Sequence, residues 1–308
     1  MKKVIICVDA GGTSTKIAVI DQNKEILIKN IIGPGSPAVN INACEDIYNA
    51  LTKLYNEIKD SYLISAIILG MSGFALVDTT NYKKQLEDRF KTNIILISDV
   101  DLAYYSTIKD EYNFGCVVVS GTGAAVQAVN DNKSFMSNGW GQLLTERGSG
   151  YTCVRDYVCL MIHTLEEKGH LSPLGNKFLE YCGFKDILDF KPLFYRHSKD
   201  EVASYSKFFI EEACRNHNKE AIKWLETNGT LIGKDIVSSC KRVKMPKDFP
   251  IGFRGGFING ITPNYQIESA IKYVKGKGYN PILVLEEDPL IGGYYYAKKN
   301  NLFGGPHE

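Results

Sequence analysis

The stretch Lys3-Val-Ile-Ile-Cys-Val-Asp-Ala-Gly-Gly-Thr-Ser-Thr-Lys16 decides how the fold of this 308-residue chain is interpreted. Its first half is a near-continuous apolar run, which is typical of a buried strand. The run ends at Asp9, and a tight polar turn follows through Gly11 and Gly12. Two further apolar segments, at residues 16–20 and 25–32, predict a second and a third strand. The chain therefore opens with three strands, the first two joined by a glycine turn.

The same order returns in the second hundred residues. Residues 114–119 predict a buried strand that ends at Ser120, and the glycine turn 121–123 follows it. A second strand at 124–129 and a short third strand at 134–137 complete the pattern. We interpret the repetition as an internal duplication, because element order and turn type agree together. The alternative is that hairpins with Gly and Asn turns are common in any α/β protein.

The rest of the sequence predicts further helices and strands. Helical periodicity predicts helices over residues 42–60, 81–90 and 102–112, a helix-rich stretch from 151 to about 245, and a terminal helix that opens at Asp288-Pro289 and runs to Lys299. Further strands are predicted at residues 65–69, 93–97, 249–253 and 282–285. We expect an N-terminal lobe of residues 1–112 with a terminal helix at about 288–304. The C-terminal lobe is expected at 113–287, with a helical insert at about 155–245.

Composition narrows the classes of function. The formal net charge is +1, so the chain has no electrostatic reason to bind nucleic acid or an anionic membrane. No apolar run approaches the roughly 18 residues that a membrane span needs, and the run that follows Lys2-Lys3 stops at Asp9, too early for a signal peptide. We expect a cytoplasmic protein. The eight cysteines show no C-x-x-C spacing and are expected to be reduced and buried.

Glycine turns after buried strands suggest phosphate handling, because glycine lets backbone N–H groups approach anionic oxygens. The Asp9 carboxylate at a strand end can hold hydrated Mg²⁺, although an acidic residue before a glycine turn is also ordinary hairpin chemistry. The sequence has no G-x-x-x-x-G-K-[ST] motif, so it has no P-loop. The turn at 121–123 begins like a dinucleotide fingerprint but has Val126 where the third Gly or Ala belongs.

Three motifs together resemble a known superfamily. Asp9-x-Gly-Gly-Thr13, Ser120-Gly-Thr-Gly123, and Gly255-Gly256 with Asn259-Gly260 resemble the phosphate-1, phosphate-2 and adenosine motifs of the sugar kinase, Hsp70 and actin superfamily. Pro289-x-x-Gly292-Gly293 resembles its second connecting segment. The resemblance covers essentially the whole chain. It implies an α/β, two-lobed, duplicated actin-like ATPase (ribonuclease H-like) fold with the nucleotide in the inter-lobe cleft.

Within that superfamily the chain resembles the BadF/BadG/BcrA/BcrD ATPase family, and in it the N-acetylglucosamine kinases. The resemblance rests on Gly70-Met-Ser-Gly73, on Ser98-Asp99, on the phosphate-2 turn, and on Gly139-Trp-Gly141 followed by Gly148-Ser-Gly-Tyr151. The Cys-x-Cys-Gly motif of the neighbouring ROK sugar kinases is absent from the sequence. One departure concerns the sugar segment, where the family's Gly-Asp-Glu-Gly-Ser reads Thr145-Glu-Arg-Gly-Ser149.

The resemblance implies roles for individual residues. Asp99 would be the catalytic base, and Asp9 would anchor the Mg²⁺ that accompanies ATP. Contacts to ATP are implied for Gly11, Gly12, Thr13, Lys16, Gly121, Thr122, Gly123, Gly255 and Gly256. Contacts to the sugar are implied for Asn40, Ser72, Gly73, Asp99, Gly139, Trp140, Glu146 and Ser149.

Each role has an ordinary structural alternative. Asp99 could instead cap the helix predicted at 102–112, although Asp101 is the better cap candidate. Lys16 could be an exposed strand residue, the glycines could be simple turn residues, and Glu146 could be a solvated loop charge. Arg147 could pair with a substrate carboxylate, such as the lactyl group of N-acetylmuramic acid, or lie on the surface.

Three hypotheses for function remain open. The first is an ATP-dependent kinase that phosphorylates the 6-hydroxyl of N-acetylglucosamine, with glucosamine or N-acetylmuramic acid as alternative substrates. The second is an ATPase that activates a dehydratase or reductase through an iron–sulfur cluster, although Cys116, Cys153 and Cys159 lack the pattern of the activators. The third is a nucleotide-binding regulator without kinase chemistry. Family resemblance also implies a homodimer.

Overall fold

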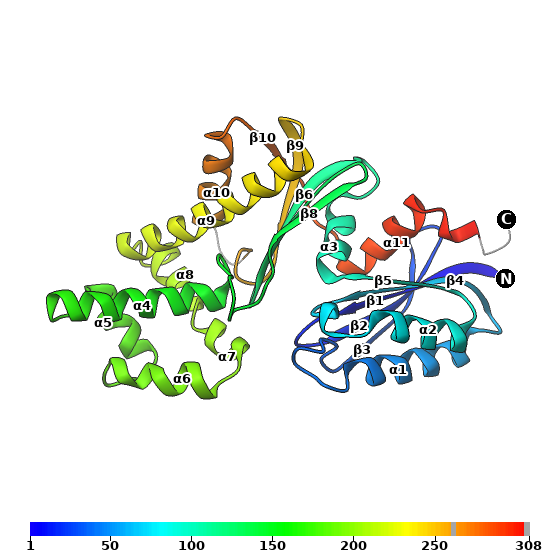
Figure 1. Ribbon diagram of the computed structural model, residues 1–308, viewed down its shortest axis with the longest axis horizontal. Helices are drawn as coiled ribbons and strands as arrows, with labels where there is room; N and C mark the ends of the chain where they lie inside the picture. Colours follow the sequence, from blue (N-terminus) through cyan, green and yellow to red (C-terminus); the bar gives the residue numbers. More distant parts are fainter. Residues whose placement is uncertain (260–262, 305–308) are drawn as a thin grey trace. The chain divides into compact units, whose positions relative to one another are not determined.

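The chain folds into two compact units, shown in Figure 1. The computed structural model describes residues 1–259 and 263–304. Unit 1 consists of Met1–Asn113 together with the segment from Leu285 onward, and unit 2 consists of Phe114–Val284. Unit 2 is therefore one contiguous segment, whereas unit 1 is assembled from both ends of the chain.

Unit 1 is built on a five-stranded sheet in the order β3-β2-β1-β4-β5. Its strands are β1 (Lys2–Ala10), β2 (Thr15–Asp21), β3 (Ile26–Ile32), β4 (Tyr62–Met71) and β5 (Asn93–Ser98). The first three strands form an antiparallel meander, and β4 and β5 run parallel to β1. The helices of this unit are α1 (Ala43–Ile58), α2 (Thr79–Phe90), α3 (Asp99–Ile108) and α11 (Pro289–Lys299).

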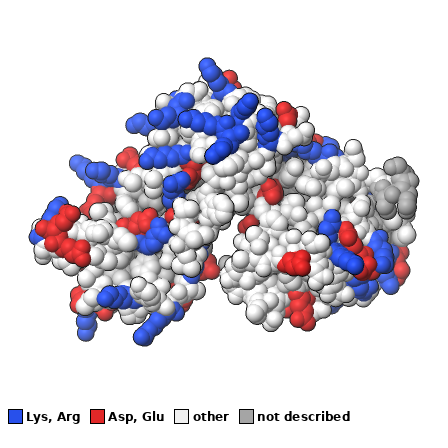
Figure 2. Space-filling view, viewed as in Figure 1, with Lys and Arg blue, Asp and Glu red and all other residues white. Residues whose placement is uncertain are grey.

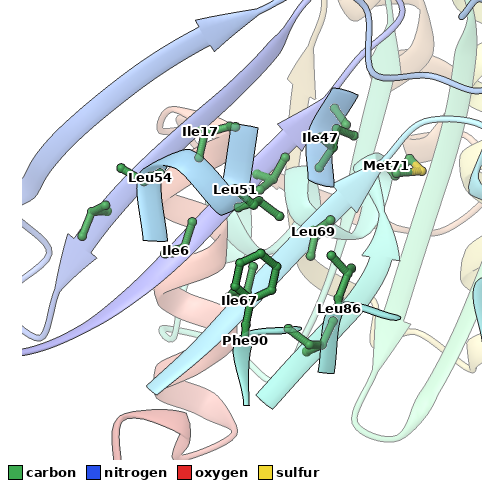
Figure 3. Close-up of a cluster of buried hydrophobic side chains, with 14 of the residues drawn as sticks. Ile6, Ile17, Ile47, Leu51, Leu54, Ile67, Leu69, Met71, Leu86 and Phe90 are labelled. Atoms are coloured by element: carbon green, nitrogen blue, oxygen red, sulfur yellow. The ribbon is translucent and has the colours of Figure 1, made fainter. Parts of the chain in front are cut away.

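Both faces of this sheet are covered, which explains the unbroken apolar run of β1. Ile6 and its even-numbered neighbours on β1 pack with Leu51 of α1 and Phe90 of α2, in the cluster drawn in Figure 3. Ile5 and Cys7 point to the opposite face, where they pack with Leu102 of α3 and with residues of α11. Because successive side chains of a strand alternate between faces, burial on both sides requires an apolar residue at every position.

Unit 2 repeats the topology of unit 1. Its strands are β6 (Phe114–Ser120), β7 (Ala124–Asn130), β8 (Lys133–Asn138), β9 (Asp248–Arg254) and β10 (Asn280–Leu283). They lie in the order β10-β9-β6-β7-β8, which is the order of unit 1 read from its other edge. The β6–β8 meander is antiparallel, and β9 and β10 are parallel to β6 and β9 respectively. The predicted duplication is confirmed.

The helices of unit 2 form two groups. They are α4 (Gly150–Lys168), α5 (Pro173–Tyr181), α6 (Phe190–Arg196), α7 (Lys199–Ser204), α8 (Lys207–Cys214), α9 (Lys219–Val243) and α10 (Tyr265–Lys275). Residues of α9 and α10 pack against β6, β7 and β9 in one core. A second core is formed among α4 to α9, with Tyr157 and Phe178 at its centre and Phe257 beside them.

Helix α3 departs from its predicted bounds. It begins at Asp99 rather than at residue 102, and it ends at Ile108. Ser98 is its N-cap and Asp101 is the reciprocal partner in a capping box, so neither aspartate is the cap that the sequence suggested. The Ser-x-x-Asp spacing satisfies two backbone donors at once, which allows the helix to start directly after β5.

Two other expectations can be compared with the structure. All eight cysteines are free, but Cys159 is exposed and Cys44, Cys182 and Cys214 are only partly buried, so the expectation of uniform burial was wrong. Among residues 1–259 and 263–304, no helix combines the length and apolarity that crossing a bilayer requires.

Candidate active site

The candidate residues of unit 1 lie at one end of its sheet, where the parallel strands finish. Asp9 is paired with Gly70 across β1 and β4, and Met71 is paired with Ser98 across β4 and β5. Ser72 continues this edge, since its N–H donates to the Ala10 carbonyl at 2.9 Å. Consequently Asp9, Ser72 and Asp99, which are far apart in sequence, are brought to the same edge.

The pKa of the Asp99 carboxyl is higher than that of an ordinary aspartate. Withdrawal from water raises the pKa of Asp99 to about 6, and the negative charge of Asp9 acts in the same direction. Hydrogen bonds from the backbone N–H groups of Val100 and Asp99 itself and from the Ser72 side chain act against this rise. A carboxylate with a pKa close to neutrality is well matched to accept a proton at physiological pH.

The glycine turn of unit 1 is held in place by the segment Gly33–Pro37. The Gly11 N–H donates to the Ser14 carbonyl at 3.1 Å, and the Gly11 carbonyl accepts from Gly35 N–H at 3.0 Å. A side chain on Gly35 would lie 2.1 Å from Thr15 Oγ1, so only glycine fits there. Thr13 is exposed at the tip of the turn, while Gly12 and Lys16 are partly buried. The turn is therefore fixed while its tip stays open.

Asn40 already has partners within unit 1. Its Nδ2 donates to the Pro34 carbonyl at 3.0 Å and to Asp46 Oδ2 at 2.8 Å, and its Oδ1 accepts from Asn42 N–H at 3.0 Å. These contacts tie the loop to the first turn of α1. Gly73, which is also assigned to the sugar, adopts a φ of 70° that favours glycine and precedes a short 3-10 turn.

The glycine turn of unit 2 is joined to the start of α4. The Ser120 hydroxyl donates to the Gly148 carbonyl at 2.6 Å, and Gly150 N–H donates to the Gly121 carbonyl at 2.8 Å. Within the turn, Gly121 N–H donates to the Gly123 carbonyl at 2.9 Å. These hydrogen bonds join the predicted phosphate-2 turn directly to the predicted sugar segment.

Gly255 is required by a close approach of two strand ends. It follows β9 with a φ of 119°, and a side chain there would lie 2.3 Å from the Ser120 carbonyl oxygen at the end of β6. Gly256 next to it faces open space. Asn259 closes the turn through its N–H, which donates to the Gly255 carbonyl at 3.0 Å. Gly260, the last residue of the proposed adenosine motif, lies outside the described residues.

Glu146 is a buried carboxylate rather than a solvated loop charge. It is 5% exposed; Ser149 Oγ donates to its Oε1 at 2.7 Å, and Lys199 Nζ lies 2.8 Å from its Oε2. Ser149 also caps α4 and forms a capping box with Thr152. The two sugar candidates Glu146 and Ser149 are therefore in direct contact.

Arg147 points to a different partner from the one the sequence suggested. Its Nε lies 3.0 Å from both carboxylate oxygens of Asp235, a residue of α9 with no exposed surface. The hypothesis of a substrate carboxylate paired with Arg147 loses its support, because this guanidinium is already neutralised. Trp140, by contrast, is 69% exposed between Gly139 and Gly141, both of which have positive φ.

Three charged residues that contact the site were missed at the sequence level. Lys199 contacts Glu146, Asp200 accepts from the Thr122 hydroxyl at 2.6 Å, and Asp235 pairs with Arg147. All three belong to the helical insert and α9, where the sequence shows no motif. No local signal identifies them, because their partners lie 53, 78 and 88 residues earlier in the chain.

The residues of unit 1 fit a magnesium ion that arrives with a nucleotide. Asp9, near the end of β1, supplies hard carboxylate oxygens, and Mg²⁺ is commonly bound by one or two carboxylates with substrate phosphates and water. Across residues 1–259 and 263–304 there is no group of three or more His, Cys, Asp or Glu side chains that could hold a metal by itself.

The cysteines near the second glycine turn do not favour an iron–sulfur cluster. Cys116 and Cys153 have no exposed surface and lie in different hydrophobic cores. Burial raises the pKa of both thiols, and Cys116 also interacts with Cys240. A cluster ligand must be a thiolate, which such surroundings disfavour.

Comparison with known proteins gives a family and named relatives. The sequence model of the BadF/BadG/BcrA/BcrD ATPase family matches residues 6–275. An N-acetylmuramic acid/N-acetylglucosamine kinase of Clostridium acetobutylicum is 26% identical over 218 residues, which is 67% of this chain and 69% of the relative. An N-acetyl-D-glucosamine kinase of Dictyostelium discoideum is 28% identical over 280 residues, 83% of this chain and 86% of the relative.

A solved structure supports the fold assignment. A protein from Porphyromonas gingivalis, provisionally named an N-acetylglucosamine kinase, superposes with a TM-score of 0.69 at 18% identity, covering 96% of this chain and 99% of the other. At this identity the likeness speaks for the fold alone. It agrees with the duplicated, actin-like α/β architecture that the sequence predicts.

Proposed function

Because the chain belongs to the BadF/BadG/BcrA/BcrD ATPase family, we propose that it is an ATP-dependent kinase that phosphorylates N-acetylglucosamine at its 6-hydroxyl. The observation that carries the proposal is the Asp99 carboxyl, whose pKa of about 6 suits a base, at the same strand edge as Asp9. Curated relatives named for N-acetylglucosamine support this choice of acceptor over glucosamine. N-acetylmuramic acid remains a second acceptor, since it appears in the name of one relative.

In the proposed reaction, Asp99 accepts the proton of the sugar hydroxyl as this oxygen attacks the terminal phosphorus of ATP. The bond from that phosphorus to the bridging oxygen breaks, and ADP leaves with the electron pair. Phosphoryl transfer depends mainly on positioning and on stabilising charge. Because the N–H groups of Gly11 and Gly121 donate within their own turns, the following residues of each turn, Gly12–Thr13 and Thr122–Gly123, would offer their N–H groups to the phosphates. Lys16 would add a positive charge.

The remaining roles follow from the residue types. Asp9 would hold Mg²⁺, which when bound neutralises charge on the phosphates. Gly255 and Gly256 would support the nucleoside. Glu146, with Ser149 beside it, would accept hydrogen bonds from sugar hydroxyls, and exposed Trp140 would offer an apolar surface to the sugar ring. Asn40, Ser72, Gly73 and Gly139 would complete the sugar contacts. We also propose that the protein is a homodimer, as its family resemblance implies.

The test is a coupled assay of ADP release over a panel of sugars, with the wild type and Asp99→Asn. We expect N-acetylglucosamine to stimulate ADP release, and Asp99→Asn to lower kcat by about a hundredfold or more, the usual contribution of a general base. Asp101→Asn is the matched control, since this residue completes the cap of α3 and is assigned no contact to either substrate. It should retain activity within about threefold and lose about 1 kcal/mol of stability.

Two outcomes would contradict the proposal. If no sugar stimulates ADP release by the wild type, the kinase assignment fails. If the Asp99→Asn variant is as active as Asp101→Asn, Asp99 is not the base.

A further inference from the structure

Helix α7 (Lys199–Ser204) touches both parts of the candidate site in unit 2 through its first two side chains. Lys199 pairs with Glu146, which the proposed function assigns to the sugar. Asp200 accepts a hydrogen bond from Thr122, which the proposed function assigns to the phosphates. Two adjacent residues of this short helix therefore contact two different segments, one assigned to the sugar and the other to the phosphates of ATP.

The Lys199 ammonium lies among Glu146, Tyr151 and Gly123. It lies 2.8 Å from Glu146 Oε2 and 6.0 Å from the centre of the Tyr151 ring. A side chain on Gly123 would lie 2.9 Å from Lys199 Nζ, so the glycine turn leaves room for the ammonium. Glu146 is far more buried than Lys199, with side-chain exposures of 2% and 24%. A carboxylate this buried needs a cation, because an unpaired buried charge is costly.

The second contact anchors the phosphate turn. Thr122 Oγ1 donates to Asp200 Oδ1 at 2.6 Å, and the Thr122 carbonyl accepts from Tyr151 N–H at 3.4 Å. The end of α7 also packs on the start of α4, where a side chain on Gly150 would lie 3.3 Å from the Ala203 carbonyl oxygen. Helix α7 and the turn at 121–123 are thus held together by side-chain and backbone packing.

We propose that the first turn of α7 positions both binding segments, with Lys199 holding the Glu146 carboxylate in place for the sugar and Asp200 fixing Thr122 of the phosphate turn. Both are positioning residues, since each acts through another side chain. The inference rests on the proposed kinase function and adds to it two residues from the motif-free insert. It also gives the insert a role in substrate affinity.

The test for Lys199 compares Lys199→Met, Lys199→Arg and Lys177→Met in steady-state kinetics. Lys177 lies 3.0 Å from Glu212 in the same group of helices, so Lys177→Met breaks a comparable Lys–Glu pair away from the site. We expect Lys199→Met to raise the KM for the sugar about tenfold while the KM for ATP changes less than about twofold. Lys199→Arg should restore most of the affinity, and Lys177→Met should leave both KM values unchanged.

The pattern across variants separates positioning from simple loss of stability. A variant that only destabilises the fold has no reason to raise one KM and not the other, whereas loss of the Lys199 ammonium removes the partner that fixes the Glu146 carboxylate at 2.8 Å. Asp200→Ala should show the opposite selectivity, with KM for ATP raised about threefold and KM for the sugar unchanged.

The outcomes are distinguishable from failure of the proposed function. If the wild type phosphorylates no sugar, the kinase proposal fails and this inference falls with it. If the wild type is active but Lys199→Met keeps a wild-type sugar KM, only the positioning role is overturned. The same holds if Lys177→Met raises the sugar KM as much as Lys199→Met does, because the effect would then be one of stability.

Discussion

Asp99 experiences opposing influences on its proton. Burial and the charge of Asp9 favour the neutral acid, whereas the backbone N–H groups at the start of α3 and the Ser72 side chain favour the carboxylate. Burial and the charge of Asp9 have the larger effect, so the pKa of Asp99 is about 6. The folded state therefore holds this proton more tightly than the unfolded chain, so an ionised Asp99 lowers stability at neutral pH. Replacement by Asn should leave the protein at least as stable.

This pKa predicts how activity depends on pH. A base must be deprotonated to act, so kcat/KM should be level above about pH 7 and fall as the pH drops through 6. The measurement is kcat/KM for the sugar at saturating ATP, with the Asp99 carboxyl titrated by NMR in the free protein. An acid limb near pH 4, the ordinary range of an aspartate, would show that neither burial nor Asp9 shifts this group.

Sequence patterns identified residues whose role is local, and missed those whose partner is distant. The placement of Asp9 and Asp99 at one sheet edge could be predicted because Asp9 lies near the end of β1, Asp99 directly follows β5, and parallel strands end at one edge. Lys199 could not, because nothing in a helical insert shows which of its many charges will face Glu146. The pairing of Arg147 with Asp235 was missed for the same reason, and a substrate carboxylate was suggested in its place.

At the scale of the element, strands and turns were predicted well and helix ends less so. Every strand in residues 1–259 and 263–304 was predicted. The central strands β1 and β6 were evident because burial on both faces needs a nearly continuous apolar run. The start of α3 was wrong because Ser98 and Asp101 satisfy the first helical donors earlier than the apolar period begins. Single glycines were recognised as turn residues, but the close contacts that require them appear only in the structure.

Gly255 offers a test of such a contact. Gly255→Ala places a methyl group 2.3 Å from the Ser120 carbonyl oxygen, at a φ of 119° that alanine rarely adopts. We expect a loss of about 3 kcal/mol in the free energy of unfolding, from steric overlap and backbone strain. Both tryptophans of the chain, Trp140 and Trp224, belong to unit 2, so their fluorescence in urea reports on this unit.

The matched control is Gly256→Ala. This position faces open space and has no positive φ, so the variant should stay within about 1 kcal/mol of the wild type. Equal stability of the two variants would contradict the claim that β9 and β6 approach closely only because residue 255 is glycine.

At the scale of the whole molecule, charge is unevenly distributed although the net charge is +1. Figure 2 shows Lys and Arg side chains gathering over α9 and α10. Backbone N–H groups and a metal ion can hold a nucleotide without a broad basic surface.

The assembly of unit 1 from both chain ends leads to the last prediction. Helix α11 supplies Leu290, Ile291, Tyr295 and Ala297 to the core on one face of the first sheet. It fits closely, since a side chain on Gly292 would lie 2.1 Å from the Leu102 carbonyl oxygen and one on Gly293 would lie 2.3 Å from Cys7 Sγ. A chain that ends at Val284 therefore loses the part of the cover over Ile5 and Ile68 that α11 supplies, and keeps only that of α3.

We expect this truncated chain to unfold in unit 1 while unit 2 stays folded. Each large apolar side chain removed costs about 2 kcal/mol in burial, and a domain has only about 5–15 kcal/mol of stability to lose. Hydrogen exchange should become fast in β1 and β4 and remain slow in β6 and β9, and the tryptophan fluorescence transition in urea should persist. Slow exchange in β1 would show that the first sheet does not need α11. Loss of the fluorescence transition would show that unit 2, although contiguous, depends on the fold of unit 1.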